Sequence, residues 1–100
     1  MSLDRRKSLV RLARQYDALI ITDDVYDMLQ WPSLHQSNTM ALTKAYVPRV
    51  VDIDRFLDRG PNDDYGNAVS NGSFSKIIAP GCRTGWAEGM EKLAYGLSQT

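Results

Sequence analysis

The sequence predicts an α/β fold with a mostly parallel sheet, and three features of the chain lead to that prediction. Residues 4–16 carry apolar side chains at helical spacing, and the isoleucine-rich run 18–22 follows almost at once. A continuous apolar run of this kind is typical of a strand buried on both faces in a parallel sheet. A second candidate strand, 68–74, and a second helical pattern, 90–98, come later. A helix that leads into a buried strand is half of a βαβ unit, from which parallel sheets are built.

The first helical segment, 4–16, is expected to be amphipathic, with its arginines and lysine mostly off the apolar face. Ser2 stands at the N-cap position, where a hydroxyl can accept a hydrogen bond from a free backbone N–H group of the first turn. The predicted apolar face consists of Leu9, Leu12, Ala13 and Tyr16.

The middle of the chain gives weaker patterns. Residues 31–48 are polar and have no clean period, which predicts a loop or an insertion. Residues 49–53 are rich in β-branched side chains and are expected to form a short strand, followed by one helical turn at 54–58. Residues 59–67 are rich in turn formers, and 84–87 reads as another short extended segment.

Composition excludes several classes of protein. The 100 residues suffice for one domain with a modest core. Twelve basic and twelve acidic side chains cancel, so no overall field favours nucleic acid or an anionic membrane. No apolar run approaches the roughly 20 residues of a membrane span. The single cysteine, Cys82, cannot form an internal disulfide and is expected to be a small, at least half-buried filler. We therefore expect a soluble, cytoplasmic protein.

A metal site is not predicted. His35 lies in the polar stretch, and no second histidine, cysteine or acidic cluster stands at ligand spacing from it. Trp31 and Trp86 are expected to be packing residues.

Polar side chains begin where the predicted strand 18–22 stops. In open α/β sheets, ligands bind beyond the carboxyl ends of the strands. Asp23 can hold a proton on a ring nitrogen of a ligand, because a nearby negative charge favours the protonated, positive form. Tyr26 offers a phenol to an oxygen on the same ring. The alternative is a strand end that turns polar only because it reaches the surface, with Asp24 facing solvent or capping the next turn.

Lys76 lies between Phe74 and the apolar run 77–79, so its amine is expected to be partly desolvated. Burial lowers the pKa of a lysine because it disfavours the charged form. A neutral amine is a nucleophile that forms Schiff bases with aldehydes. The alternative is a surface lysine next to a core strand.

A candidate phosphate site surrounds this lysine. Arg83 follows Pro80-Gly81, a pair that predicts a sharp turn able to fold the arginine back toward the lysine. Guanidinium binds phosphate through a fork of donors, and the hydroxyls of Ser73 and Ser75 add neutral donors. The alternative is an ordinary Pro-Gly loop with an exposed arginine.

Three motifs occur in a fixed order along the chain: Asp23-x-x-Tyr26, Ser73-x-Ser75-Lys76, and Pro80-Gly81-x-Arg83-x-Gly85-Trp86. Together they resemble fold type I pyridoxal-phosphate enzymes and, more narrowly, class I/II aminotransferases on the aminoadipate and kynurenine transaminase branch. The resemblance implies that residues 1–100 are a fragment of the three-layer αβα large domain, with N-terminal and C-terminal parts missing.

The resemblance also implies roles for the residues of these motifs. Lys76 would carry the Schiff base to pyridoxal 5'-phosphate and shuttle the proton between the substrate and the cofactor. Asp23 would pair with the pyridine nitrogen, and Tyr26 would hydrogen-bond the ring hydroxyl oxygen. The phosphate would be bound by Ser73, Ser75 and Arg83.

The function implied is transfer of an amino group between an amino acid and a 2-oxo acid, in a homodimer of the full-length protein. The fragment alone is expected to be inactive. Two alternatives stay open, since the same anchoring residues serve other reactions. One is a pyridoxal-phosphate-dependent lyase or decarboxylase, and the other is the cofactor-sensing, aminotransferase-like domain of a transcription regulator.

Overall fold

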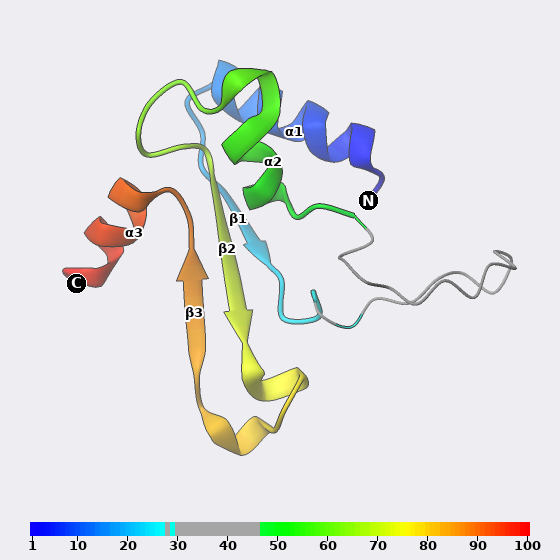
Figure 1. Cartoon of the computed structure of the whole chain (residues 1–100), viewed down its shortest axis with the longest axis vertical. Helices are drawn as coiled ribbons and strands as arrows, with labels where there is room; N and C mark the ends of the chain where they lie inside the picture. Colours follow the sequence, from blue (N-terminus) through cyan, green and yellow to red (C-terminus); the bar gives the residue numbers. More distant parts are fainter. Residues whose placement is uncertain (28, 30–46) are drawn as a thin grey trace, which may run out of the picture.

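A computed structural model describes residues 1–27, 29 and 47–100. Within these ranges, helices and the strands of one small sheet follow each other along the chain (Figure 1). Short 3-10 turns, written η, lie in the connection after the second helix and in the connection between the last two strands. The elements are α1 (Leu3–Gln15), β1 (Ile20–Asp23), α2 (Val50–Phe56), η1 (Leu57–Arg59), β2 (Ala68–Ser73), η2 (Phe74–Lys76), η3 (Pro80–Cys82), β3 (Gly85–Glu88) and α3 (Glu91–Ser98).

The sheet has the order β1-β2-β3, so β2 is the central strand of the described part. β1 runs parallel to β2, with Ile20 opposite Ala68, whereas β3 runs antiparallel to β2, with Glu88 opposite Ser70. The predicted strands at 18–22 and 68–74 and the parallel pairing are therefore confirmed. The antiparallel third strand follows from the short connection after β2, because strands that pair in parallel need a long crossover.

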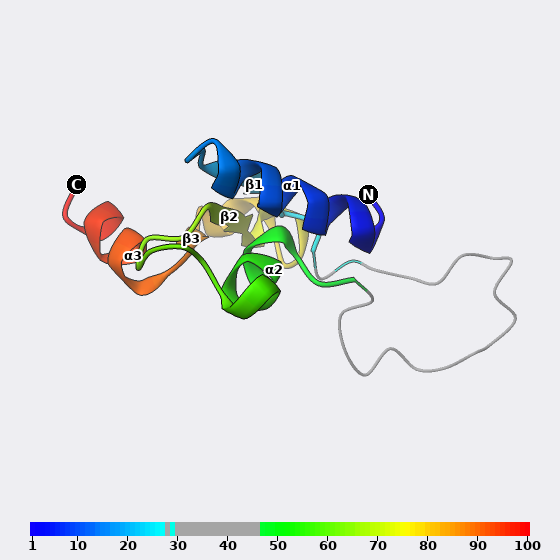
Figure 2. The ribbon, with the colours of Figure 1, turned by 90° about the horizontal axis from the view of Figure 1, so that it is seen from above.

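The core lies between one face of the sheet and the helices α1 and α2 (Figure 2). Val10 of α1 and Val51 of α2 are fully buried and meet Ala68 of β2. On the other face of the sheet, Val69 is buried, and its side chain and that of Leu93 in α3 both lie against Gly89.

The expectation that the first strand is buried on both faces is wrong. Along β1 the residues alternate between half-buried and exposed, and Ile21 is 71% exposed. The cause is the placement of the helices: α1 and α2 share one face, and α3 is the only described helix near the other.

The strand predicted at 49–53 is also wrong, because this segment begins α2. The carboxylate of Asp52 accepts a hydrogen bond from the backbone N–H of Arg49 at 3.1 Å, which satisfies a donor at the start of the helix. The β-branched residues Val50, Val51 and Ile53 then fall on the buried side. Their packing against α1 and β2 outweighs their preference for strands.

The predicted first helix is confirmed, but its buried face is not the one expected. Ser2 caps α1 as predicted, accepting a hydrogen bond from the backbone N–H of Arg5. Val10 and Ala13 are buried, whereas Leu12 and Tyr16 are exposed. The helix is rotated about its axis toward α2, where its last basic residue, Arg14, pairs with the buried Asp54.

The predicted C-terminal helix is confirmed as α3. The predicted polar stretch 31–48, with Trp31 and His35, lies outside the described residues except at its last two positions. None of the helices in the described ranges has the length and hydropathy needed to cross a membrane.

Candidate functional site

The carboxyl ends of the two parallel strands bring the first two predicted motifs to one end of the sheet (Figure 1). β1 ends at Asp23, which stands opposite Asn71 of β2. β2 continues for two residues beyond Asn71 and ends at Ser73. Register partners in a sheet project to the same face, so Asp23, Asn71 and Ser73 share the face that lies opposite α1 and α2. In open α/β sheets, ligand-binding sites lie beyond the carboxyl ends of the strands, which is where these side chains are found.

Ser73 and Ser75 are held together by local hydrogen bonds. The Oγ atom of Ser73 accepts from the backbone N–H of Ser75 at 3.0 Å and lies 3.0 Å from the Oγ atom of Ser75. The Oγ atom of Ser73 also lies 3.4 Å from the carbonyl oxygen of Thr84, so the single hydrogen of this hydroxyl has two acceptors within reach. The two hydroxyls therefore lie together at the start of η2, where neutral donors of this kind suit an anionic oxygen.

Arg83 lies next to this serine pair through the backbone of the hairpin. The Phe74 N–H donates to the carbonyl of Thr84 at 3.1 Å, and Ser73 stands opposite Gly85. The turn predicted at Pro80-Gly81 is present as η3, and Arg83 follows it in the left-handed conformation, with φ of 50°. Its side chain is exposed, at the same end of the sheet as the serines.

Lys76 ends η2 and is exposed, which differs from the expected partial desolvation. The backbone N–H groups of Ile77 and Ile78 both donate to the carbonyl of Phe74, which curls the chain into a tight turn at the surface. Ile78 is itself 66% exposed, so within the described residues the flanking apolar side chains do not cover the amine.

The structure places the remaining predicted side chains at the same end of the sheet without joining them. In the described part of the chain, Asp23, Lys76 and Arg83 make no side-chain hydrogen bond or ion pair. Tyr26, in the turn after β1, is 58% exposed. In the part of the chain that the structure describes, the amine, the guanidinium and the carboxylate are thus without side-chain partners, and the bonded serine hydroxyls lie at the same end of the sheet.

Trp86 shapes the hairpin that carries most of these groups. Its indole lies across Gly72, where an added Cβ would come within 2.3 Å of the ring. Its ring centroid is 5.0 Å from that of Phe74, the first residue of η2. The expected packing role of Trp86 is therefore observed, and its contacts are with Gly72 and Phe74 at the end of β2.

Two expectations about neighbouring residues are wrong. Cys82 is exposed, because the η3 turn projects from the end of the sheet. Asp24 is half-buried, and its carboxylate is bonded to side chains of the sheet instead of facing open solvent or capping the next turn. Its Oδ2 atom accepts hydrogen bonds from Thr22 Oγ1 at 2.5 Å and from Ser70 Oγ at 2.6 Å. Strand alternation was the missed signal, since it places Asp24 on the same face as Thr22.

A cluster of charges lies beside this site on the helix-covered face. Arg49 pairs with Glu88 at 2.8 Å and with Asp52 at 2.9 Å, and Arg55 pairs with Glu88 at 2.9 Å. The pKa of Glu88 is lowered, chiefly by its hydrogen bond from Arg49. Arg49, Asp52 and Glu88 border a hollow of about 370 Å³. Asp24 also lines it, together with Ser70, Gly72, Trp86 and Ile77.

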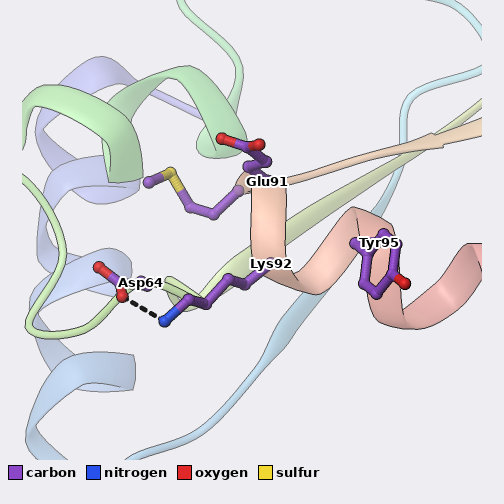
Figure 3. A pocket seen from close by; sticks show the side chains of 5 residues that line it. Asp64, Glu91, Lys92 and Tyr95 are labelled. Atoms are coloured by element: carbon purple, nitrogen blue, oxygen red, sulfur yellow. Dashed lines mark hydrogen bonds and ion pairs between the residues drawn. The ribbon is translucent and has the colours of Figure 1, made fainter.

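A second hollow, of about 510 Å³, lies at the start of α3 (Figure 3). Lys92 is paired there with Asp64 at 2.5 Å, and Met90 and Tyr95 supply apolar surface. The start of α3 lies at the opposite end of the sheet from η2 and η3 (Figure 1). None of the predicted site residues lines this hollow.

Known proteins are similar to this chain in sequence and in fold. No protein-family model matches the chain. An uncharacterized protein of Saccharomyces cerevisiae is 44% identical over 98% of the chain and 21% of its own length. The kynurenine/alpha-aminoadipate aminotransferase of Rattus norvegicus is 34% identical over 90% of the chain and 16% of its own length. The chain thus spans about a fifth of the length of these curated relatives.

A solved structure agrees with these matches. The multiple substrate aminotransferase of Thermococcus profundus superposes with a TM-score of 0.65 at 32% identity, over 99% of the chain and 20% of that protein. Other relatives carry the name of aromatic amino acid aminotransferases. The chain is therefore homologous, along almost its whole length, to one segment of the α/β domain of the aminotransferases, as its three motifs predict.

Proposed function

We propose that this chain is the cofactor-binding segment of a pyridoxal-phosphate-dependent aminotransferase, which moves an amino group between an amino acid and a 2-oxo acid. One observation carries the proposal: Asp23 and the Ser73–Lys76 turn lie at the same end of a parallel strand pair, with Arg83 beside them. The homology to aminotransferases supports it, because it covers all three motifs.

The cofactor's phosphate would bind at the serine pair and Arg83. The paired hydroxyls of Ser73 and Ser75 would supply neutral donors, and the guanidinium of Arg83 would supply charge and a fork of donors. The backbone bond between Phe74 and Thr84 holds these groups on one hairpin. Because the side chain of Arg83 has no partner in the described part of the chain, binding an anion there breaks no existing ion pair.

The other two residues would act at the cofactor's ring and aldehyde. Asp23 would hold a proton on the ring nitrogen, since a carboxylate favours the charged form of a base next to it. Lys76 would bind the aldehyde carbon through its amine and afterwards move a proton to and from the substrate. Tyr26 would donate to the ring oxygen. When bound, the cofactor supplies an electron sink for the carbon that loses the proton.

Borohydride reduction followed by peptide mass analysis tests this assignment. In the protein that carries the chain, treated with pyridoxal 5'-phosphate and then reduced, we expect the cofactor's mass on the peptide that contains Lys76. Lys76→Ala should abolish both the label and the visible absorbance of the bound cofactor. Lys92→Ala is the matched control, because Lys92 is also exposed but is paired with Asp64. A label on Lys92, or an unchanged label in Lys76→Ala, would contradict the proposal.

A screen of amino donors separates the reaction classes. Transamination consumes one 2-oxo acid for each one formed, whereas a lyase or decarboxylase releases product without an amino acceptor. We propose that the full-length protein is a cytoplasmic homodimer, which gel filtration with light scattering and cell fractionation would test.

A further inference from the structure

Three hydrogen bonds hold Asp24, and two of them attach the turn after β1 to the central strand. Its Oδ2 atom accepts from Thr22 Oγ1 at 2.5 Å and from Ser70 Oγ at 2.6 Å. Its backbone N–H donates to the carbonyl of Asn71 at 2.8 Å. Ser70 is 1% exposed, so one end of this connection is anchored in the interior of the sheet.

The connection lies on the opposite side of the backbone from the predicted ring-binding carboxylate. Side chains alternate along a strand, so Thr22 and Asp24 project toward the helix-covered face, and Asp23 projects toward the other. A strand end held on one face by side-chain bonds cannot rotate about its axis without breaking them. The side chain on the other face is thereby kept in one direction.

The same connection also sets the position of the following turn. The Asp24 carbonyl accepts from the backbone N–H of Asp27 at 3.0 Å, which closes the turn in which Tyr26 lies. Loss of the Asp24 side chain would therefore loosen both members of the first motif, Asp23 and Tyr26, without removing either.

From this geometry we infer that Asp24 is a positioning residue, which keeps Asp23 and Tyr26 directed at a bound ring through its hydrogen bonds to Thr22 and Ser70. The inference rests on the proposed function, because it assumes that Asp23 meets a ligand. It concerns geometry and not charge, since a single oxygen atom, Oδ2, accepts both side-chain bonds.

The use of a single acceptor atom for both bonds makes the inference testable by substitution. An asparagine places one carbonyl oxygen where Oδ2 now lies, so Asp24→Asn keeps both acceptor bonds and loses the charge, whereas Asp24→Ala loses both bonds. In the full-length protein we would titrate pyridoxal 5'-phosphate and follow its visible absorbance. We expect Asp24→Ala to weaken binding about tenfold, the scale of one or two lost bonds to a charged group. Asp24→Asn should stay within about threefold of the unmodified protein.

A double-mutant cycle then shows whether Asp24 acts through its neighbour. Adding Asp24→Ala to Asp23→Ala should weaken binding little further, because the direction of an absent carboxylate no longer matters. Equal losses in both backgrounds, or an Asp24→Asn variant as weak as Asp24→Ala, would overturn the inference. If Asp23→Ala alone leaves cofactor affinity unchanged, the proposed role of Asp23 fails instead, so the two failures are distinguishable.

Global unfolding provides the check on structure. Asp24 and Ser70 line the 370 Å³ hollow, so water can reach the groups left unpaired in Asp24→Ala. We therefore expect the variant to fold. Should it unfold instead, Ser70→Ala removes one of the two side-chain bonds and should give a smaller loss of affinity in the same direction.

Discussion

Charged side chains occur in two regions of the molecule: the junction of α1 and α2 with the sheet, and the hairpin after β2. They are buried and paired at the junction, and exposed and unpaired in the described part of the hairpin. At the junction, the side chains of Arg14 and Asp54 are 8% and 1% exposed. Arg14 donates to Asp54 Oδ1 at 3.1 Å, and Asp54 Oδ2 accepts from the backbone N–H of Asn67 at 2.6 Å. In the hairpin, Lys76 and Arg83 are exposed and have no partner in the described part of the chain.

The contrast distinguishes charged side chains that stabilise the fold from charged side chains that are free to bind a ligand. A charge taken out of water is costly unless it is paired and fully hydrogen-bonded, so the junction is saturated with partners. An exposed charge keeps its water and needs no partner. The hairpin can therefore hold free cations at little expense of stability, and a ligand can pair with them later.

Breaking the saturated junction should have the largest effect on stability. Asp54→Ala leaves the Arg14 guanidinium buried without its carboxylate and the Asn67 N–H without an acceptor. We expect the free energy of unfolding to fall by about 3–5 kcal/mol, measured by urea denaturation. Arg11→Ala is the control, because Arg11 pairs with Asp58 where both side chains are more than half exposed, and its midpoint should barely move. Equal losses in the two variants would remove the distinction between the regions.

The hairpin has one tightly packed point, and overfilling it gives the next largest effect. In Gly72→Ala the new methyl group would lie 2.3 Å from the Trp86 indole. We expect a loss of about 1–3 kcal/mol in urea denaturation. Cofactor affinity should fall as well, since Ser73 follows directly. Gly81→Ala is the matched control on the same hairpin, because a Cβ there meets nothing within 4 Å. An unperturbed Gly72→Ala would show that the indole moves freely.

Relieving backbone strain in the hairpin should separate stability from binding. Arg83 adopts φ of 50°, a left-handed conformation that glycine adopts without cost, so Arg83→Gly should stabilise the protein by about 1 kcal/mol. It should also abolish tight binding of pyridoxal 5'-phosphate. Arg59→Gly is the control, since Arg59 has φ of 73° and lies away from the hairpin. It should gain stability and keep affinity, and a loss of affinity there would argue against a specific phosphate site.

The smallest effect concerns the partly exposed charges beside the site. The pKa of Glu88 is lowered from its ordinary value of 4.5, first by its hydrogen bond from Arg49. Because the folded pKa is depressed, the stabilisation is present above about pH 4.5 and is lost as the pH falls below it. We expect about 0.5 kcal/mol, discounted for solvent screening. Urea midpoints measured from pH 6 down to about pH 3 should fall less steeply in Glu88→Gln than in the unmodified protein; identical slopes would contradict this.

Sequence patterns predicted which segments form helices and strands better than they predicted which faces of those segments are buried. The helical spacing of 4–16 and 90–98 and the runs at 18–22 and 68–74 identify α1, α3, β1 and β2. The segment 49–53 misled, because its β-branched residues favour a strand in isolation and are buried on a helix here.

The candidate site follows the same division. Its three motifs could be found from residue type and spacing, and their meeting at one end of the sheet follows from the parallel pairing of β1 and β2. The partners of Asp24 could not be found in this way, because Ser70 is distant in the chain and becomes its neighbour only through strand register. The exposure of Lys76 likewise depends on the curl of η2 and not on the apolar residues beside it.

By itself, the sequence determined the α/β class, the order of the elements and the identity of the side chains offered to a ligand, since these depend on local periodicity and residue chemistry. Only the tertiary structure decided which face of β1 is covered, that Arg14 meets Asp54, and that Asp24 is tied to Ser70. The physical reason is that burial and pairing depend on contacts between residues far apart in the chain, which no local pattern contains.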